Sequence, residues 1–358
     1  MASNNGRPLS LWQPCAYNLT EPIEESLSVR IPKPAALMWF GVCATCTAAA
    51  AGAQSVQPTE FQVTGEFQTG RLSEVSGVAV SRTQPGVVWI HNDSGDRARV
   101  YATNLAGTLL GSFRVVDAQA RDWEDIALGP CLGKHRDSHC IYIADTGDNN
   151  GTRQNGIIYI VPEPRAQAEP TDEEMSTEPA HAITVRYPDG PHDIEALAVT
   201  LDGNILLVTK GTRGPILLFS ISLNEPDTGL AYATLVDTLP IRPARRFGNL
   251  VTAAAVSPSG GFLVVRTYTE LYFFRRDAED GWTAIGSPCW IGLRQPQGEA
   301  VDFLNETSVV LASEAAMGRR GGLARAVCPI DVGVRRTPEN DRITPVSVTP
   351  LAETRSRR

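Results

Sequence analysis

Residues 195–209 read EALAVTLDGNILLVT: a short apolar segment that opens with a glutamate, a turn, and a second apolar segment. Two apolar runs separated by Asp-Gly-Asn are typical of a β-hairpin. Four further units of this form open with SGVAV, EDIAL, TAAAV and EAVDF, at residues 76, 124, 252 and 299. The five starts are separated by 48, 71, 57 and 47 residues. These spacings are close to the roughly 40 to 50 residues of a β-propeller blade.

A third apolar segment follows each hairpin, and four of the five units contain a fourth. The third segments are RVYATN, GIIYIVP, ILLFSISL, LYFFRR and GLARAVC, and the fourth are GSFRVV, AITVRYP, ATLVDTLP and WTAIG. Four antiparallel strands repeated radially predict an all-β fold, a five-bladed β-propeller. Residues 163–178, rich in Pro, Glu and Thr, are interpreted as a surface loop within the second unit.

The fifth unit lacks a clear fourth strand. Either residues 60–66 (EFQVTGE) or residues 343–350 (ITPVSVTP) could supply it. A strand from the N-terminal side would close the ring and remove exposed sheet edges. The alternative is a six-bladed propeller, in which the terminal segments pair to form another blade.

Composition indicates a globular chain with no nucleic-acid partner. Of 358 residues, 20% are charged and 42% hydrophobic, which is ordinary for a chain that buries a core. Acidic residues outnumber basic ones 40 to 32, and no basic cluster precedes the C-terminal RSRR. We expect one propeller domain over residues 54–350, a disordered tail over residues 351–358, and a monomer.

The N-terminal 53 residues have the features of a targeting segment. Arg30 and Lys33 precede a mostly apolar stretch over residues 34–50, and residues 51–53 form an A-x-A-like cleavage site. We therefore interpret residues 1–53 as an N-terminal extension with a signal or leader segment, and expect a secreted or periplasmic protein without an integral membrane span. A membrane anchor formed by an uncleaved leader is the alternative.

Cysteine usage agrees with export. Three of seven cysteines fall in residues 1–53, which leaves Cys131, Cys140, Cys289 and Cys328. An even number in an exported chain indicates disulfides. Of three connectivities we favour Cys131 with Cys140, closing a short connection, and Cys289 with Cys328, stapling the last blade.

Each hairpin begins at a residue with a side-chain oxygen, and we call these five residues the column. They are Ser76, Glu124, Glu195, Thr252 and Glu299. In radially packed blades their oxygens converge on one axis, where carboxylates repel one another unless a cation is present. Calcium accepts about six to eight oxygen ligands in loose geometry, so the column predicts a calcium cofactor. The alternative is that these side chains only satisfy backbone groups at the channel mouth.

A second set of polar residues follows the second strand of each hairpin, at the same end of the sheet as the column. This set is Asn92, Asp93, Asp145, Lys210, Arg266 and Glu314, with Asp148 added by the repeated motifs DSGD and DTGD. The D-x-E spacing places Asp122 beside Glu124 on an extended strand, and Asp193 beside Glu195. We expect a funnel for a small anionic ligand; a network of ion pairs is the alternative.

The order hydroxyl, Glu, Glu, hydroxyl, Glu, one per blade, resembles the central site of the five-bladed calcium-activated nucleotidases, the apyrase-type propellers. The resemblance covers residues 76–314 and is one of architecture. The strings DWEDIA, DTGDN and YPDGPHDIEAL also look like a group of secreted bacterial propeller proteins of uncharacterised activity.

The nucleotidase resemblance implies calcium-dependent hydrolysis of a phosphate ester or anhydride. It would make Lys210 and Arg266 phosphate ligands, with Asn92 and Asp148 as further substrate contacts. Its catalytic residues, which orient or deprotonate a water molecule, would be Asp93, Asp145 and Glu314.

Other functions fit the same pattern. A propeller can bind a ligand or a protein without turnover, since this fold hosts many functions. Paired carboxylates also serve glycoside hydrolysis, and phytase-like or esterase-like propellers are a further option. Lys210 and Arg266 favour an anionic ligand over a neutral sugar.

Overall fold

The computed structural model describes residues 55–93, 95–132, 138–222, 229–242, 247–279 and 281–330. Across these ranges the chain forms β-strands and one 3-10 helix, Phe247–Asn249. None of the described segments is a helix of the length and apolarity needed to cross a membrane. The predictions for residues 1–53, 343–350 and 351–358 lie outside the described ranges.

The strands form five sheets in which the chain runs from an innermost to an outermost strand. The first sheet contains β2 (Val75–Val80), β3 (Val88–Asn92), β4 (Arg99–Thr103) and β5 (Leu109–Val116). The second contains β6 (Trp123–Pro130), β7 (His139–Asp145), β8 (Gly156–Pro162) and β10 (His181–Arg186). The third contains β11 (Ile194–Val199), β12 (Ile205–Thr209), β13 (Leu217–Ile221) and β15 (Thr234–Thr238).

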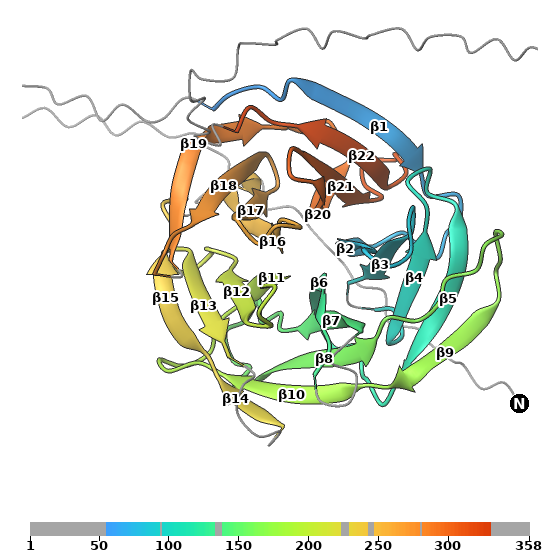
Figure 1. Cartoon of the computed structure of the whole chain (residues 1–358), viewed down its shortest axis with the longest axis horizontal. Helices are drawn as coiled ribbons and strands as arrows, with labels where there is room; N and C mark the ends of the chain where they lie inside the picture. Colours follow the sequence, from blue (N-terminus) through green and yellow to red (C-terminus); the bar gives the residue numbers. More distant parts are fainter. Residues whose placement is uncertain are drawn as a thin grey trace, which may run out of the picture. The chain divides into compact units, whose positions relative to one another are not determined.

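The last two sheets follow the same plan. The fourth contains β16 (Val251–Val256), β17 (Phe262–Thr267), β18 (Glu270–Arg276) and β19 (Trp282–Trp290). The fifth contains β20 (Gln297–Asn305), β21 (Ser308–Glu314), β22 (Gly322–Val327) and β1 (Glu60–Glu66). Each innermost strand contacts the innermost strands of both adjacent sheets, and Figure 1 shows all five around one centre. The five-bladed β-propeller is confirmed.

The N-terminal strand closes the ring. β1 pairs antiparallel with β22, so residues 60–66 supply the missing fourth strand of the fifth blade, and the six-bladed alternative is wrong. Both favoured disulfides are present, Cys131–Cys140 and Cys289–Cys328. Because Cys289 lies on β19 and Cys328 follows β22, the second bond joins the fourth blade to the fifth instead of stapling the fifth alone.

Three segments extend the outer edge of the preceding blade. β9 (Glu174–Pro179) pairs parallel with β5, and β14 (Leu230–Tyr232) pairs parallel with β10. Val56 forms a parallel bridge to Cys289 on β19 in the same way. Residues 163–178 are thus not wholly a loop, because their last part belongs to β9 and connects the second blade to the first.

The hydrophobic core consists of five clusters, one between each pair of adjacent blades. The innermost strands are buried on both faces, which explains why they read as continuous runs of small apolar residues without alternation. Trp89 and Trp123 pack within the cluster between the first and second blades.

Two buried aspartates add polar links between innermost strands. Asp125 on β6 accepts hydrogen bonds through Oδ2 from Leu197 N of β11, at 2.9 Å, and from Ala254 N of β16, at 3.1 Å. Asp302 on β20 accepts one from Val80 N of β2, at 2.7 Å. These bonds hold the inner ends of the blades, and with them the column, in fixed positions.

Candidate functional site

All five column residues occupy equivalent positions in the structure. In every blade the register between the innermost strand and its neighbour shifts at the column residue, so each one is the extra residue of a bulge. Each residue is buried, from 1% exposed at Thr252 to 8% at Glu299. The repeat detected in the sequence therefore corresponds to a repeated backbone feature at the start of the innermost strands.

The column side chains nevertheless have different partners. Ser76 Oγ donates a hydrogen bond to the backbone oxygen of Glu124 at 2.5 Å, which links the first two blades. Glu195 Oε1 lies 2.6 Å from Lys210 Nζ, and Glu299 Oε1 accepts a bond from Gln297 Nε2 at 2.9 Å. Thr252 Oγ1 is buried without a hydrogen-bond partner among the described residues. Three of the five column residues thus already use a side-chain oxygen for a contact within the protein.

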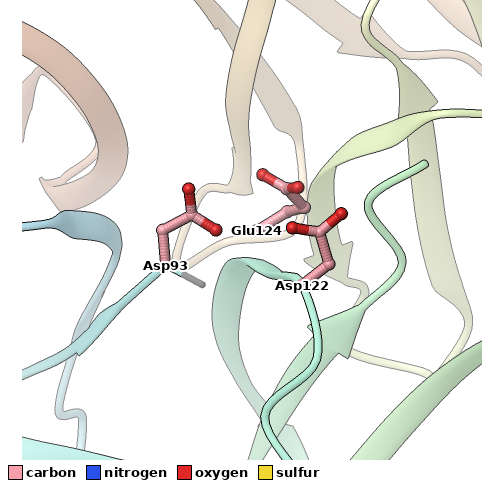
Figure 2. A group of neighbouring side chains, drawn as sticks. All are labelled: Asp93, Asp122 and Glu124. Atoms are coloured by element: carbon pink, nitrogen blue, oxygen red, sulfur yellow. The ribbon is translucent and has the colours of Figure 1, made fainter. Parts of the chain in front are cut away.

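Glu124 lies in a group of three carboxylates, which we call the acidic triad. Asp93 follows β3, Asp122 precedes β6, and Glu124 is the column residue of β6. One carboxylate oxygen from each lies within 4.8 Å of the others, and Figure 2 shows the three side chains around a common space. The D-x-E spacing thus places Asp122 beside Glu124 as expected, and Asp93 joins them from the first blade.

Gly147 provides the space that the triad occupies. A Cβ at this position would lie 2.0 Å from Glu124 Oε1 and 2.5 Å from Asp122 Oδ2. Any other residue would therefore displace both carboxylates. Gly147 belongs to the DTGD motif, and its role here is to leave room beside the carboxylates.

The end of the propeller at which the column residues and the acidic triad lie is called the opening from here on. Its acidic groups raise one another's pKa. Burial raises the pKa of Glu124 well above its usual range, and the charges of Glu195, Asp93 and Asp122 raise it further. Burial likewise raises the pKa of Asp122, with Asp93 as the next cause. A positive charge placed among these groups would relieve both effects.

Two further carboxyl groups of the opening are shifted in the same direction. Burial raises the pKa of Glu299 to about 7, against opposing contributions from Gln297, Arg266 and Lys210. Burial raises the pKa of Glu314 to about 8, with Glu299 and Glu74 as the next causes. Both groups therefore change protonation near neutral pH, as a general acid or base requires.

Lys210 is a cation at the opening, and it is already paired. Its Nζ contacts Glu195 Oε1 at 2.6 Å and Asn149 Oδ1 at 3.1 Å, and its side chain is 13% exposed. The charges of Glu195 and Glu124 raise the pKa of Lys210, so the ammonium group stays charged. Lys210 thus lies beside the column residue Glu195, with a small part of its side chain exposed to solvent.

Arg266 is placed elsewhere than the funnel prediction expects. It is 1% exposed, and its Nη1 donates to Ala300 O at 2.5 Å and Ala312 O at 3.1 Å, while Nη2 donates to Gln295 Oε1 at 2.9 Å. Gly298 leaves room for this guanidinium. Arg266 therefore connects the fourth and fifth blades inside the protein, and its side chain is not exposed to a ligand at the start of the innermost strands.

Asp145 is likewise committed to the protein. It is 1% exposed, its Oδ1 lies 2.8 Å from Arg153 Nη1, and the same oxygen accepts a hydrogen bond from Asp122 N at 3.1 Å. The alternative for the second set was a network of ion pairs formed by Lys210 and Arg266, whereas the partner of Asp145 in the structure is Arg153. The carboxylate of Asp145 thus holds the backbone that carries Asp122, and the structure gives it no contact among the described residues that supports the predicted catalytic role.

Two of the predicted substrate contacts are also structural. Asp148 accepts hydrogen bonds from Thr152 N and Arg153 N, both at 2.9 Å, and so shapes the turn after β7. Asn92 is 5% exposed and donates through Nδ2 to Arg71 O at 2.6 Å and to Asp96 Oδ2 at 2.8 Å. Neither side chain is directed to a ligand in the opening.

Sequence reasoning missed Gly147 and Arg153 as parts of the site. Both lie within DTGDNNGTR, at residues 145–153, where the repeated DxGD motif marks the turn but not the side chains beside it. The pairing of Arg153 with Asp145 has no signal in the spacing alone, because it depends on how the turn folds back.

Comparison with known proteins identifies no family for this chain: the sequence matches no family and no curated protein. Among solved structures, the PQQ-bound aldose sugar dehydrogenase of Streptomyces coelicolor is 12% identical, with 75% of this chain and 98% of that chain covered and a TM-score of 0.45. A putative 6-phosphogluconolactonase of Bacteroides uniformis is 13% identical, with 75% and 79% covered and a TM-score of 0.38. Hydrazine synthase of Kuenenia stuttgartiensis is 8% identical, with 67% and 64% covered and a TM-score of 0.35.

Proposed function

We propose that this propeller binds calcium at the acidic triad, Asp93, Asp122 and Glu124, and uses the ion to bind and hydrolyse a phosphate ester or anhydride. The observation that carries the proposal is the approach of three carboxylate oxygens within 4.8 Å of one another. Ionised carboxylates at this separation repel strongly unless a cation lies between them. The two disulfides support export to an oxidising compartment, where calcium is a common ligand of proteins.

The side chains suit calcium both in the chemistry of their donor atoms and in the space beside them. The triad offers hard oxygen donors, which suit calcium, whereas zinc favours nitrogen and sulfur ligands. Gly147 leaves the space in which Glu124 and Asp122 approach each other. Thr252 Oγ1 is buried and has no hydrogen-bond partner among the described residues. It could therefore hold a water molecule that is itself a ligand of the ion.

The proposal revises the predicted ligand set. Glu124 is kept from the column, and Asp93 and Asp122 replace Ser76 and Glu195, whose oxygens contact Glu124 O and Lys210 Nζ. Glu299 is left out of the revised ligand set; burial raises its pKa, and the charge of Asp93 contributes to the increase.

For hydrolysis we assign roles to two residues of the opening. A bound calcium ion would supply the positive charge that holds a phosphate group. Lys210 contacts a second phosphate oxygen through its charged Nζ. Glu314 accepts a proton from the attacking water, whose oxygen bonds to phosphorus as the P–O bond to the leaving group breaks, and the protonated Glu314 then returns the proton to the leaving oxygen; its raised pKa places its titration near neutral pH, as both transfers require.

A second candidate is calcium-dependent binding of an anionic ligand without turnover. The burial of Arg266 and the pairing of Lys210 with Glu195 favour it, because fewer cations remain to stabilise a transferring phosphate. Both candidates share the calcium site and differ in turnover.

The metal assignment is tested by calcium titration of the double variant Asp122→Asn/Glu124→Gln, with the exposed Glu169→Gln as a matched control. We expect calcium affinity to fall at least about 10-fold in the double variant and to stay unchanged in the control. In chelator the double variant should melt at a higher temperature than the wild type, because two repelling carboxylates are neutralised. Unchanged calcium affinity in the double variant rejects the site.

Turnover is tested with phosphate esters, nucleotides and aryl glycosides, each in calcium and in chelator. We expect release of phosphate only with calcium, and loss of at least about 100-fold in kcat in Glu314→Gln with calcium affinity retained. Calcium binding without any turnover would support the second candidate.

A further inference from the structure

A cavity of about 540 Å³ lies at the other end of the propeller from the acidic triad. Its walls come from the ends of β2 and β20 and from neighbouring hairpin turns, where Val80, Leu105, Pro258 and Leu304 supply apolar surface. The column residues stand at the beginnings of the same innermost strands, so the cavity is separated from the triad by about the length of a strand. Its volume is in the range of small-molecule sites.

The turn that forms one wall of this cavity is held in place by a single carboxylate. Glu163 accepts hydrogen bonds from Thr83 Oγ1 at 2.6 Å, from Gln84 Nε2 at 3.1 Å and from Trp89 Nε1 at 2.8 Å. Gln84 Oε1 in turn accepts a bond from Ala166 N at 2.9 Å. The cavity wall is therefore fixed before any ligand arrives, which lowers the entropic cost of binding.

Arg82 is the cation of the cavity wall, and most of its donors remain unused. Its Nη2 lies 3.4 Å from Asp302 Oδ1 and 3.5 Å from Oδ2, and its Nε and Nη1 have no hydrogen-bond partner among the described residues. The acid of the wall, Glu306, is already paired: its two oxygens accept bonds from Ser259 N and Ser259 Oγ at 2.7 and 2.8 Å.

We propose that this cavity binds a small monocarboxylic acid with an apolar chain. The carboxylate accepts a charge-assisted hydrogen bond from Nη1 of Arg82, which the contacts of Nη2 with Asp302 leave open. The apolar chain lies against Val80, Leu105 and Leu304. A dianion such as a phosphate monoester is disfavoured, because Asp302 already pairs with this guanidinium and Glu306 adds a second negative charge to the cavity lining.

The test compares four ligands that share one chain, octanoate, 1-octanol, octylamine and octyl phosphate, by calorimetric titration in chelator. Chelator makes the result independent of the proposed calcium site. We expect octanoate to bind at least about 10-fold more tightly than each of the other three, the gain of one charge-assisted pair. Equal binding of octanoate and octanol, or no binding of octanoate, overturns the proposal.

Two variants locate the binding in this cavity. Arg82→Gln should bring octanoate to the affinity of octanol, whereas Arg320→Gln, an exposed arginine near the opposite end of the fifth blade, should leave both affinities unchanged. Leu304→Ala should weaken octanoate and octanol alike and preserve their ratio. If octanoate keeps its preference in Arg82→Gln, the carboxylate binds elsewhere and the assignment is wrong.

Discussion

At the scale of single residues, the acidic opening depends on Gly147 as much as on the carboxylates themselves. The space that a Cβ would fill at this position is already filled by Glu124 Oε1 and Asp122 Oδ2. Carboxylates that approach each other in this way lower the stability of the fold when they are ionised, because burial and mutual repulsion raise the pKa of both. Such an arrangement is typical of a site that holds a cation.

The variant Gly147→Ala should lower calcium affinity at least about 10-fold, because the added methyl group separates two carboxylates of the triad. The free energy of unfolding should change by less than about 1 kcal/mol, since the displaced atoms are the ends of flexible side chains. Calcium titration and denaturant unfolding measure the two quantities. Gly70→Ala, where a Cβ meets no atom within 4 Å, is the matched control. An unchanged calcium affinity in Gly147→Ala would contradict the triad.

At the scale of strands, the blades are connected by segments that leave one blade and pair with the outer edge of the one before. β9, β14 and Val56 all pair parallel with the outermost strand of the preceding blade, and each lies just before the outermost strand of its own blade. Covering an edge in this way removes unpaired backbone groups from the rim. These parallel pairings at the rim thus connect adjacent blades in addition to the ring closure by β1.

The two disulfides should differ in their contribution to stability. Cys131–Cys140 spans 9 residues and stays within the second blade, whereas Cys289–Cys328 spans 39 and joins two blades at the closure. Loop entropy predicts losses of about 2.5 kcal/mol for Cys131→Ser/Cys140→Ser and about 4 kcal/mol for Cys289→Ser/Cys328→Ser. Denaturant unfolding of both double variants measures the losses, and each is the other's control. Equal losses of unfolding free energy would show that the loop entropy of the unfolded chain does not determine how much each disulfide stabilises the protein.

Most strands could be predicted from the sequence, because each begins or ends at a turn and carries a run of apolar residues. The five innermost strands and the hairpins were all predicted in this way, and β1 was one of two candidates for the closing strand. β9 was missed because EMSTEP is polar, lacks alternation and pairs with a strand more than 50 residues away in another blade. Pairing between blades depends on the three-dimensional path of the chain, which local pattern does not contain.

At the scale of the whole molecule, the same difference separates the polar residues whose position could be predicted from the repeat from those whose position could not. The repeat correctly brings all five column residues to one position in each blade, because the period itself encodes that position. Whether a polar residue at the end of a second strand points into the opening or into a blade interface depends on its neighbours. Gly298 leaves room for the Arg266 guanidinium between the fourth and fifth blades. Arg153 forms an ion pair with Asp145, so that this carboxylate contacts the protein.

The free energy of unfolding of the propeller should also depend on pH, because Asp302 titrates. Burial raises its pKa from 3.8 to about 6, against the opposing effect of Arg82 and of two backbone N–H groups. Between these values the folded chain binds more protons than the unfolded chain, so the contribution of Asp302 to stability is present below pH 3.8 and is lost as the pH rises through 6.

Comparison of the wild type with Asp302→Asn by denaturant unfolding isolates this effect, because the other carboxylates cancel in the difference. The stability of the wild type relative to the variant should fall by about 3 kcal/mol between pH 3.5 and 7, since each pKa unit corresponds to about 1.4 kcal/mol. The exposed Asp172→Asn controls for exchanging a carboxylate for an amide. If the Asp302→Asn and wild-type curves stay parallel over this range, the inner ring does not hold Asp302 in its protonated form, and the link between β20 and β2 is that of an ordinary ionised carboxylate.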